Sequence, residues 1–353
     1  MLVEIDGSIY EGGGAIFRNS LALSAATQRP VKVFRIRAKR SKPGLRPQHL
    51  MVAKALTRMT LGKATGLAIG SQEVIFYPQR VLGGSYVLDI GTAGSITLLL
   101  QAILPAAVFA SSKVKLKVIG GTDVPMAPPV DYFHHVFLPA LRDMGVIVHL
   151  KLLRRGHYPK GGGICEVEVD PVNVLAPILR LERGEITRVS GVAHAVRLPK
   201  HVVERIASSA EDALRRHGIE GVEIKRDYRP NRGHLGPGAG IVLWAIDDLG
   251  NVLGADALGK RGKPSEQVGR EAAEKLIKEI QSGCPVDRHL GDMLIPYMAM
   301  ASGRSEIRVS CLTLHTLSNI AVAEKILGVS FSISGREGAP ATIAVEGAAI
   351  RRS

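Results

Sequence analysis

The stretch GTAGSITLLLQAILPAAVFASSKVKLKVIGG, from Gly91 to Gly121, decides the fold. It begins with small residues, continues as a Leu- and Ala-rich apolar run, and ends in a basic segment whose side chains alternate in polarity. Gln101 and Pro105 interrupt the apolar run, which is too short to span a bilayer and predicts a core helix. The alternation in VKLKV predicts a half-buried strand.

Two further segments repeat this layout, GGGAIFRNSLALSAATQRPVKVFRIRA from Gly12 and GDMLIPYMAMASGRSEIRVSC from Gly291. After each of the three segments, a second apolar-periodic run predicts another helix. These helices end in Gly62, Gly145 and Gly328, where a left-handed residue would stop them. The common unit is strand, helix, strand, helix, strand, which predicts an α/β layered architecture.

The interval between the second and third units is much longer than the interval between the first and second. Residues 181–283 fill it with their own predicted strands and two predicted helices. This content is enough for a small α+β domain. We therefore expect a large domain from residues 1–180 plus 284–353, with residues 181–283 inserted as a second domain.

The charge of the chain favours a polyanionic partner. Among 353 residues, 46 are Lys or Arg and 32 are Asp or Glu, a formal net charge of +14. This excess is typical of proteins that bind RNA, DNA or nucleotides, although a charge-rich surface alone would also produce it. Aromatic residues are only 4% of the chain, which argues against a stacking platform that coats single strands. Phosphate contacts through Arg and Lys fit better.

The cysteines and the N-terminal residues indicate the cellular compartment in which we expect the chain. Cys165, Cys284 and Cys311 form no CxxC pair, so the sequence contains no disulfide framework or zinc ribbon that can be recognised. The N-terminal residues lack the basic and then apolar pattern of a signal peptide. A reducing cytoplasm is the simplest setting, and we expect no membrane partner.

A glycine-rich turn precedes the first helix. Glu11 and three glycines, Gly12 to Gly14, lie between a short predicted strand and that helix. Glycines let backbone N–H groups approach an anion at a helix N-terminus, although a tight turn uses glycine in the same way. Glu11 could hold a divalent cation, which prefers oxygen ligands, or could be an ordinary surface acid.

A basic run, RIRAKRSKPGLRPQHL, follows the first unit from Arg35 to Leu50. If the strand continues through it, Arg37 and Lys39 share one strand face and Arg40 lies in the turn beyond. Arginine forks suit terminal phosphates, and a solvated basic edge is the alternative. The run therefore predicts a site for a nucleic-acid end.

His315 lies in LTLHTLSNIA, where a predicted strand leads into a predicted helix. For a single histidine at such a junction, a structural role is the default. A helix N-terminus disfavours the imidazolium, however, and a neutral imidazole is a competent nucleophile toward phosphorus. The segment GADALGK, from Gly254 to Lys260, nearly matches the spacing of a nucleotide-binding P-loop. It is not one, because the next residue is Arg261, where a P-loop has Ser or Thr.

Six motifs together resemble the RNA 3′-terminal phosphate cyclases over nearly the whole chain: DGSIYEGGGAIFRNSLALS, RAKRSKPGLRPQHL, GTAGSITLLLQAILPA, GGTDVPMAPPVDY, RRGHYPKGGG and HTLSNIAVAEKIL. The resemblance implies a large domain of three βαβαββ-type repeats, like the C-terminal domain of translation initiation factor three, plus a smaller inserted domain. It also implies ATP-dependent conversion of an RNA 3′-terminal phosphate to a 2′,3′-cyclic phosphate, through a covalent histidine–AMP and an RNA(3′)pp(5′)A intermediate.

The resemblance implies roles for individual residues. His315 falls on the nucleophile, and Glu11 on a glutamate associated with Mg²⁺ or Mn²⁺. The positions implied to contact the nucleotide are Gln101, Pro128, Tyr132, His289, Leu290, Gly291, Asp292 and Met293. The positions implied to hold phosphates or the RNA end are Arg18, Arg37, Arg40 and Gln48. The family often has Tyr at the position of His289 and Gln at the position of Met293, so nucleobase contacts are expected to differ.

Two other functions compete with the cyclase. Non-catalytic relatives act as RNA-binding factors in ribosome biogenesis but lack the nucleophilic histidine. Enolpyruvyl transferases use similar repeats but need a phosphoenolpyruvate site, which fits the basic chain and its HTLSNIAV segment poorly. The presence of His315 and Asp292 favours the cyclase, whose expected partner is an RNA with a 3′-terminal phosphate. A homodimer is left open.

Overall fold

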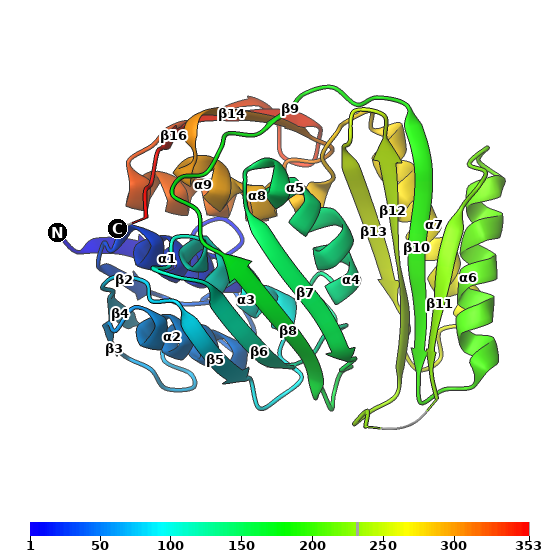
Figure 1. Cartoon of the computed structure of the whole chain (residues 1–353), viewed down its shortest axis with the longest axis horizontal. Helices are drawn as coiled ribbons and strands as arrows, with labels where there is room; N and C mark the ends of the chain where they lie inside the picture. The colour runs from blue at the N-terminus through cyan, green and yellow to red at the C-terminus, as the bar shows by residue number, and fades with distance from the viewer. Residues whose placement is uncertain (231–232, 353) are drawn as a thin grey trace.

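Residues 1–230 and 233–352 are described by this computed structural model, and within them the strands form four four-stranded sheets (Figure 1). Each sheet contains both parallel and antiparallel pairs. In every sheet, a helix lies between at least one pair of strands that are consecutive in the chain. The predicted mixed α/β class is therefore confirmed.

The first sheet has the strand order β1-β2-β4-β3, with β1 parallel to β2. Two helices belong to it, and the first begins directly after the glycine-rich turn. In chain order the elements are β1 (Val3–Asp6), α1 (Gly14–Thr27), β2 (Val31–Phe34), α2 (Pro47–Met59), β3 (Lys63–Thr65) and β4 (Val74–Tyr77).

The second sheet has the equivalent order, β5-β6-β8-β7. Its elements are β5 (Gly84–Asp89), α3 (Ile96–Ala107), β6 (Val114–Gly120), α4 (Val130–Tyr132), the π-helix η1 (Phe133–Phe137), α5 (Leu138–Asp143), β7 (Ile147–Arg154) and β8 (Gly163–Asp170). The Gly91–Gly121 stretch forms α3 and β6 as predicted: the Ser95 hydroxyl caps α3 by accepting from the Leu98 N–H at 3.1 Å, and β6 alternates in burial. RRGHYPKGGG connects the antiparallel strands β7 and β8 and is a hairpin loop.

The third sheet has the order β15-β16-β14-β9, which is the same arrangement read from the other edge. Its elements are β9 (Leu179–Arg180), α8 (Arg288–Met300), β14 (Ser302–Val309), α9 (Leu314–Leu327), β15 (Phe331–Gly335) and β16 (Ala341–Ala348). The edge strand β9 pairs in parallel with β14, with Leu179 opposite Glu306. The first strand of this unit therefore precedes all of the fourth sheet in the chain.

The fourth sheet lies within residues 181–283 and has the order β11-β10-β12-β13. Its elements are β10 (Ile186–Val196), α6 (Lys200–Arg215), β11 (Glu223–Arg229), β12 (Gly238–Asp247), β13 (Val252–Leu258) and α7 (Ser265–Gln281). Its two helices pack against each other and enclose an apolar cluster with the sheet. In Figure 1 this sheet stands beside β7, α4 and α5. The exact domain boundaries stay a prediction.

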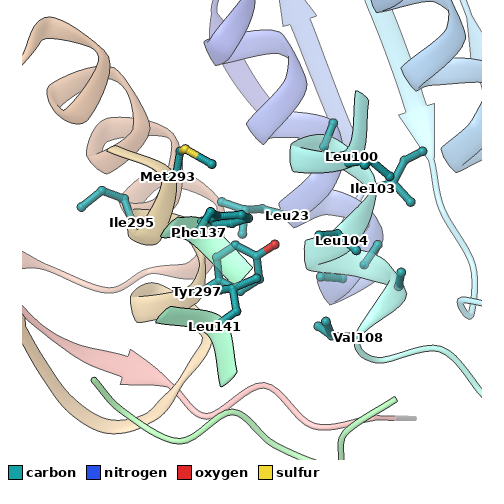
Figure 2. Close-up of a cluster of buried hydrophobic side chains, with 14 of the residues drawn as sticks. Leu23, Leu100, Ile103, Leu104, Val108, Phe137, Leu141, Met293, Ile295 and Tyr297 are labelled. Atoms are coloured by element: carbon teal, nitrogen blue, oxygen red, sulfur yellow. The ribbon is translucent and has the colours of Figure 1, made fainter. Parts of the chain in front are cut away.

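The first three sheets surround a shared helical core. Helix α1 packs against α3 and α9, and α8 packs against α9. Figure 2 shows side chains from helices of the three units meeting there, among them Leu23 of α1, Leu104 of α3, Phe137 of η1 and Tyr297 of α8. Each of these four side chains is at most 1% exposed. Because the helices of all three units share one core, their ends are held in fixed positions relative to one another.

The predicted helix stops are confirmed at two of three positions. Gly145 and Gly328 have left-handed φ angles of 87° and 74°. Gly62 does not, and Leu61 takes the left-handed conformation instead, with φ of 50°. The glycine at position 62 has another physical reason, because a Cβ there would lie 2.5 Å from the carbonyl oxygen of Tyr77.

Two observations concern the cellular location that we predicted for the chain. All three cysteines are free thiols, with Cys165 and Cys284 buried and Cys311 partly exposed. Over residues 1–230 and 233–352, no helix has both the length and the apolar character needed to cross a lipid bilayer. Neither observation tests the predicted cytoplasmic location, which stays a prediction.

Candidate active site

A cavity of about 600 Å³ lies where helices of the three units converge. It is lined by side chains from α1, α2, α3, α8 and α9, from the loops that follow β2 and β6, from α4 and η1, and from β13 and α7. The predicted site residues that line it are Arg18, Arg37, Arg40, Gln48, Gln101, Pro128, Tyr132, His289, Asp292, Met293 and His315. Residues far apart in the sequence therefore share one cavity.

His315 is the second residue of α9, and its side chain is 49% exposed. The N-cap of this helix is Thr313, whose hydroxyl accepts from the Thr316 N–H at 3.0 Å, so capping does not occupy the imidazole. Burial, aided by the charges of Arg18 and Arg40 and opposed by Glu11, holds the pKa of His315 below its ordinary value. The ring is therefore neutral at neutral pH and keeps a nitrogen lone pair.

Glu11 lies beside His315, with its Oε1 3.8 Å from the histidine Nδ1. Its Oε2 accepts a hydrogen bond of 2.6 Å from Arg40 Nη2, while Oε1 is buried without a hydrogen-bond partner among the described residues. The glycine-rich turn makes this position accessible, since a Cβ on Gly13 would lie 2.0 Å from Oε2. Glycine at position 13 is therefore needed for the backbone of the turn to lie this close to the Glu11 carboxylate.

The arginines reach the cavity by a different backbone path from the one predicted. Strand β2 ends at Phe34, and Arg35 and Arg37 have left-handed φ angles of 50° and 55°. The prediction that Arg37 and Lys39 share a strand face is wrong, because a tight turn replaces the strand there. Arg37 is fixed by donating from Nη1 to the carbonyl oxygens of Lys42 at 2.6 Å and Gly44 at 2.8 Å.

Arg18 enters the cavity from α1. Burial lowers its pKa to about 10, and the neighbouring carboxylates of Glu11 and Asp292 oppose this shift. A group with this pKa still carries its positive charge at neutral pH. Together with Arg37 and Arg40, it gives the cavity a cluster of guanidinium groups suited to phosphate.

Gln48 and Gln101 line the cavity from α2 and α3. The side-chain oxygen of Gln48 accepts from the Ser95 N–H at 3.0 Å, which connects the N-terminus of α2 to that of α3. Pro128 lies in the loop before α4, where its carbonyl oxygen accepts from the Thr97 hydroxyl at 2.6 Å. These contacts fix this part of the cavity wall.

The α8 segment from His289 to Met293 is only partly in the cavity. His289, Asp292 and Met293 line it, whereas Leu290 is 3% exposed in the core and Gly291 packs closely against Val309. Leu290 and Gly291 do not line the cavity, because the helix turns them toward its other face, and their implied contacts with a nucleotide stay a prediction.

Asp287 holds the start of α8 against the cavity wall. Its Oδ1 accepts from the backbone N–H groups of His289 at 2.8 Å and Leu290 at 3.0 Å. The Tyr132 hydroxyl also donates to this carboxylate, at 2.8 Å. Burial, with added repulsion from Asp287, raises the pKa of Asp292. This part of the cavity wall therefore combines the aromatic ring of Tyr132 with the carboxyl group of Asp292.

Comparison with known proteins identifies the family. A model of the RNA 3'-terminal phosphate cyclase family matches residues 9–333. The chain is 51% identical to the RNA 3'-terminal phosphate cyclase of Korarchaeum cryptofilum over 348 residues, covering 99% of both chains. It is 49% identical to the cyclase of Ignicoccus hospitalis over 354 residues (99% and 100%). The chain belongs to the RNA 3'-terminal phosphate cyclase family. The predicted family and its enzymatic nature are therefore confirmed.

This member of the cyclase family has three cavity residues that lie within the quoted sequence motifs but had no predicted role. His49 is buried in the cavity wall, and its Nε2 has no hydrogen-bond partner among the described residues. Asn19 donates to Asn319 at 2.6 Å, and Asn319 donates to the Asp292 carbonyl oxygen at 2.8 Å. Apolar periodicity gave no signal for these polar side chains on helices.

Two further cavity residues of this cyclase family member come from residues 181–283. Asp256 of β13 and Lys275 of α7 line the same cavity as His315. The Lys275 ammonium donates to the Asp256 carbonyl oxygen at 2.9 Å. The fourth sheet therefore contributes to the site, which sequence spacing alone did not predict.

Proposed function

We propose that this chain converts the 3′-terminal phosphate of an RNA into a 2′,3′-cyclic phosphate, with ATP and a covalent histidine–AMP. The observation that carries the proposal is His315 at the start of α9, in a cavity that also contains Arg18, Arg37 and Arg40. Membership of the cyclase family supports it, because the relatives are named as RNA 3'-terminal phosphate cyclases.

In the first step, neutral His315 attacks the α-phosphorus of ATP. Its Nδ1 faces Glu11, which leaves Nε2 as the attacking nitrogen. The new bond is N–P, the bond between the α-phosphorus and the β-phosphate oxygen breaks, and pyrophosphate leaves. In the covalent product the imidazole ring carries a positive charge. Its Nδ1–H faces the Glu11 carboxylate, which stabilises this charge.

In the second step, an oxygen of the RNA 3′-phosphate attacks the phosphorus of histidine–AMP. The N–P bond breaks, His315 returns to its neutral form, and the RNA carries a 3′-linked diphosphate to adenosine. In the third step, the adjacent 2′-hydroxyl oxygen attacks the RNA phosphorus. The hydroxyl proton is lost, the bond to AMP breaks, and AMP leaves.

Each step gathers negative charge on a phosphorus with five oxygen or nitrogen neighbours. The guanidinium groups of Arg18, Arg37 and Arg40 are the cavity groups that would stabilise this charge. Pro128, Tyr132 and Met293 give the cavity an apolar surface suited to a nucleobase. These features support our proposal that both the phosphates and the base of ATP bind in this cavity.

The family implies ATP, and a divalent metal is part of our proposal. Glu11 fits such an ion, because its Oε1 is buried and lacks a hydrogen-bond partner among the described residues. Glu11 would hold Mg²⁺ or Mn²⁺, which when bound supplies positive charge to the triphosphate. The proposed roles of His315 and the arginines require no further metal ligand.

We propose that the first three sheets, each with its two helical segments, are three βαβαββ repeats of one large domain. The shared strand order of these sheets supports this. Residues 181–283 would then be a domain inserted between β9 and α8. A cytoplasmic location and an RNA with a 3′-phosphate as partner belong to the same proposal.

The substrate assignment predicts a requirement for the 2′-hydroxyl. With ATP and Mg²⁺, an RNA oligonucleotide ending in a 3′-phosphate should become resistant to phosphatase, as a cyclic phosphate is. An otherwise identical oligonucleotide with a 2′-deoxy terminal sugar should stop as the adenylylated end, because it lacks the third-step nucleophile. Equal phosphatase resistance of both without an adenylylated product would refute the proposal.

The lowered pKa of His315 predicts the pH dependence of self-adenylylation. The attacking form is the neutral ring, and its folded-state pKa lies below the ordinary 6.5. The single-turnover rate with α-labelled ATP should therefore be constant near neutral pH and fall only once the pH passes below about 6.5. An apparent pKa at or above 6.5 would contradict the assignment.

The Glu11→Gln variant tests the same assignment through a shift in the pH at which the adenylylation rate falls. The Glu11 carboxylate raises the pKa of His315, so its removal should move the acidic fall in rate to still lower pH. The position of this fall is the measurement, since the overall rate also decreases if Glu11 holds the metal. A shift toward higher pH would show that Glu11 and His315 are not coupled as proposed.

A further inference from the structure

A second cluster of chemically active side chains lies outside the cavity lining. Asp123, His157 and His194 are buried, with exposures of 2%, 5% and 0%. They come from three segments: the loop after β6, the β7–β8 hairpin loop, and β10 of the fourth sheet. Candidate ligand atoms of the three side chains all lie within 4.8 Å of one another.

The geometry of the cluster suits one metal ion. The two Nε2 atoms of His157 and His194 are 3.0 Å apart, and each lies 4.0 Å from a different carboxylate oxygen of Asp123. Ligand atoms about 2.0–2.2 Å from a tetrahedral Zn²⁺ are about 3.3 Å from each other. Small side-chain adjustments would therefore bring all three donors onto a single ion.

The rings are held in place by close packing against β12. A Cβ on Gly238 would lie 2.0 Å from Cγ of His157, and a Cβ on Gly240 would lie 3.0 Å from Cε1 of His194. Glycine at these positions leaves room for both imidazoles. The donors are thus positioned by the fold before any ion binds.

The charges near the cluster favour a cation. Arg155 is the central guanidinium, and it contacts the carboxylates of Asp123 at 3.2 Å, Asp131 at 2.8 Å and Asp227 at 2.9 Å. Arg229 also pairs with Asp227, at 2.9 Å. Two guanidinium groups therefore face three carboxylates, which leaves negative charge in excess.

The protonation states also suit metal ligation. Burial lowers the pKa values of His157 and His194, so both rings are neutral and carry a lone pair. Burial opposes ionisation of Asp123, but the positive charge of Arg155 and the hydrogen bond from the Thr122 hydroxyl help to lower its pKa. Neutral imidazole and ionised carboxylate are the forms that bind Zn²⁺.

We propose that Asp123, His157 and His194 form a binding site for one Zn²⁺ ion, separate from the ATP cavity. The Nδ1 atoms of both rings lack hydrogen-bond partners among the described residues. Leaving two buried N–H groups unpaired is unfavourable, but this cost is small beside the free energy that a bound structural zinc ion supplies. The ion would hold β10 to the β7–β8 hairpin and to the loop that carries Pro128.

The test measures metal content and needs no enzymatic activity. Purified protein is dialysed against a chelator, loaded with Zn²⁺ or Co²⁺ without ATP, freed of excess metal and analysed by elemental mass spectrometry. Wild type should retain about one ion per chain, and Co²⁺ should give the visible absorption of a tetrahedral nitrogen and oxygen site. Zinc should also raise the thermal unfolding midpoint.

Matched variants locate the ion. The H157Q/H194Q double variant should retain less than about a tenth of the wild-type metal, and its single variants confirm the result if the double variant fails to fold. His217 lies between α6 and β11, outside the cluster, so the His217→Gln variant should retain as much metal as wild type. If wild type binds no metal, or H157Q and H194Q bind as much as wild type, the paired histidines form only a hydrogen bond and the proposal is wrong.

Two active-site variants separate this inference from the proposed function. Glu11→Gln removes the carboxylate of the first metal proposal, and His315→Ala removes the proposed nucleophile. Both should keep the zinc ion, while His315→Ala loses adenylylation and Glu11→Gln adenylylates more slowly. Loss of zinc in Glu11→Gln would place the ion in the ATP cavity and overturn the second site, whatever the fate of the cyclase proposal.

Discussion

The His315→Ala variant is expected to carry no covalent AMP after incubation with α-labelled ATP and a divalent metal. Removing a catalytic nucleophile lowers rates by on the order of 10⁴–10⁶-fold, because no other group is placed to form the covalent bond. The measurement is acid-labile radioactivity on the protein after denaturing gel electrophoresis. RNA cyclisation should be lost to the same extent, since the second step starts from the adenylylated enzyme.

A matched histidine gives the control. His149 is exposed on β7 and is absent from the cavity lining, so His149→Ala should label like wild type. If His315→Ala also labels like wild type, His315 is not the nucleophile. His49 would then be the next histidine to test, because its unpaired Nε2 faces the same cavity.

The second large effect is expected at Arg155, as a loss of stability. Its guanidinium is 2% exposed and contacts three carboxylates on three segments. Arg155→Ala leaves the buried carboxylates of Asp123 and Asp131 without their partner. Breaking a buried ion pair in this way typically lowers the free energy of unfolding by about 3–5 kcal/mol. Denaturant unfolding in the presence of a chelator measures this change without a contribution from bound metal.

Arg205 provides the comparison for this measurement. Its ion pair with Glu266 joins the solvent-facing surfaces of α6 and α7, and its side chain is 51% exposed. Arg205→Ala should lower the free energy of unfolding by no more than about 1 kcal/mol, because water screens exposed pairs. Similar small losses in both variants would mean that the Arg155 network does not hold the three segments together.

Local pattern was enough to predict much of the fold. The apolar run and alternating strand in Gly91–Gly121 became α3 and β6, since burial periodicity depends on neighbouring residues alone. The two-residue strand β9 was missed because Leu179 and Arg180 carry no periodicity. Arg35 and Arg37 were placed in a strand, but their left-handed backbone is set by the turn that brings basic groups to the cavity.

The site was less accessible to sequence reasoning than the fold. Without the family resemblance, His315 was only a histidine at a strand-to-helix junction. Its neighbours Arg18 and Glu11 are almost the whole chain away, and only tertiary packing brings them together. Asp256 and Lys275 were missed because their segment was interpreted as a separate domain, and its contribution to the cavity depends on how it is positioned.

The place of β9 in the chain also constrains the order of events on a ribosome. The first two sheets each draw all their strands from a continuous stretch and can complete their pairing as that stretch emerges. Strand β9 must wait for its partner β14, with Leu179 opposite Glu306, until the whole fourth sheet has been synthesised. At about 5–20 residues per second, this delay lasts several seconds or more. The nascent chain thus has time to fold the intervening segment before the last sheet closes.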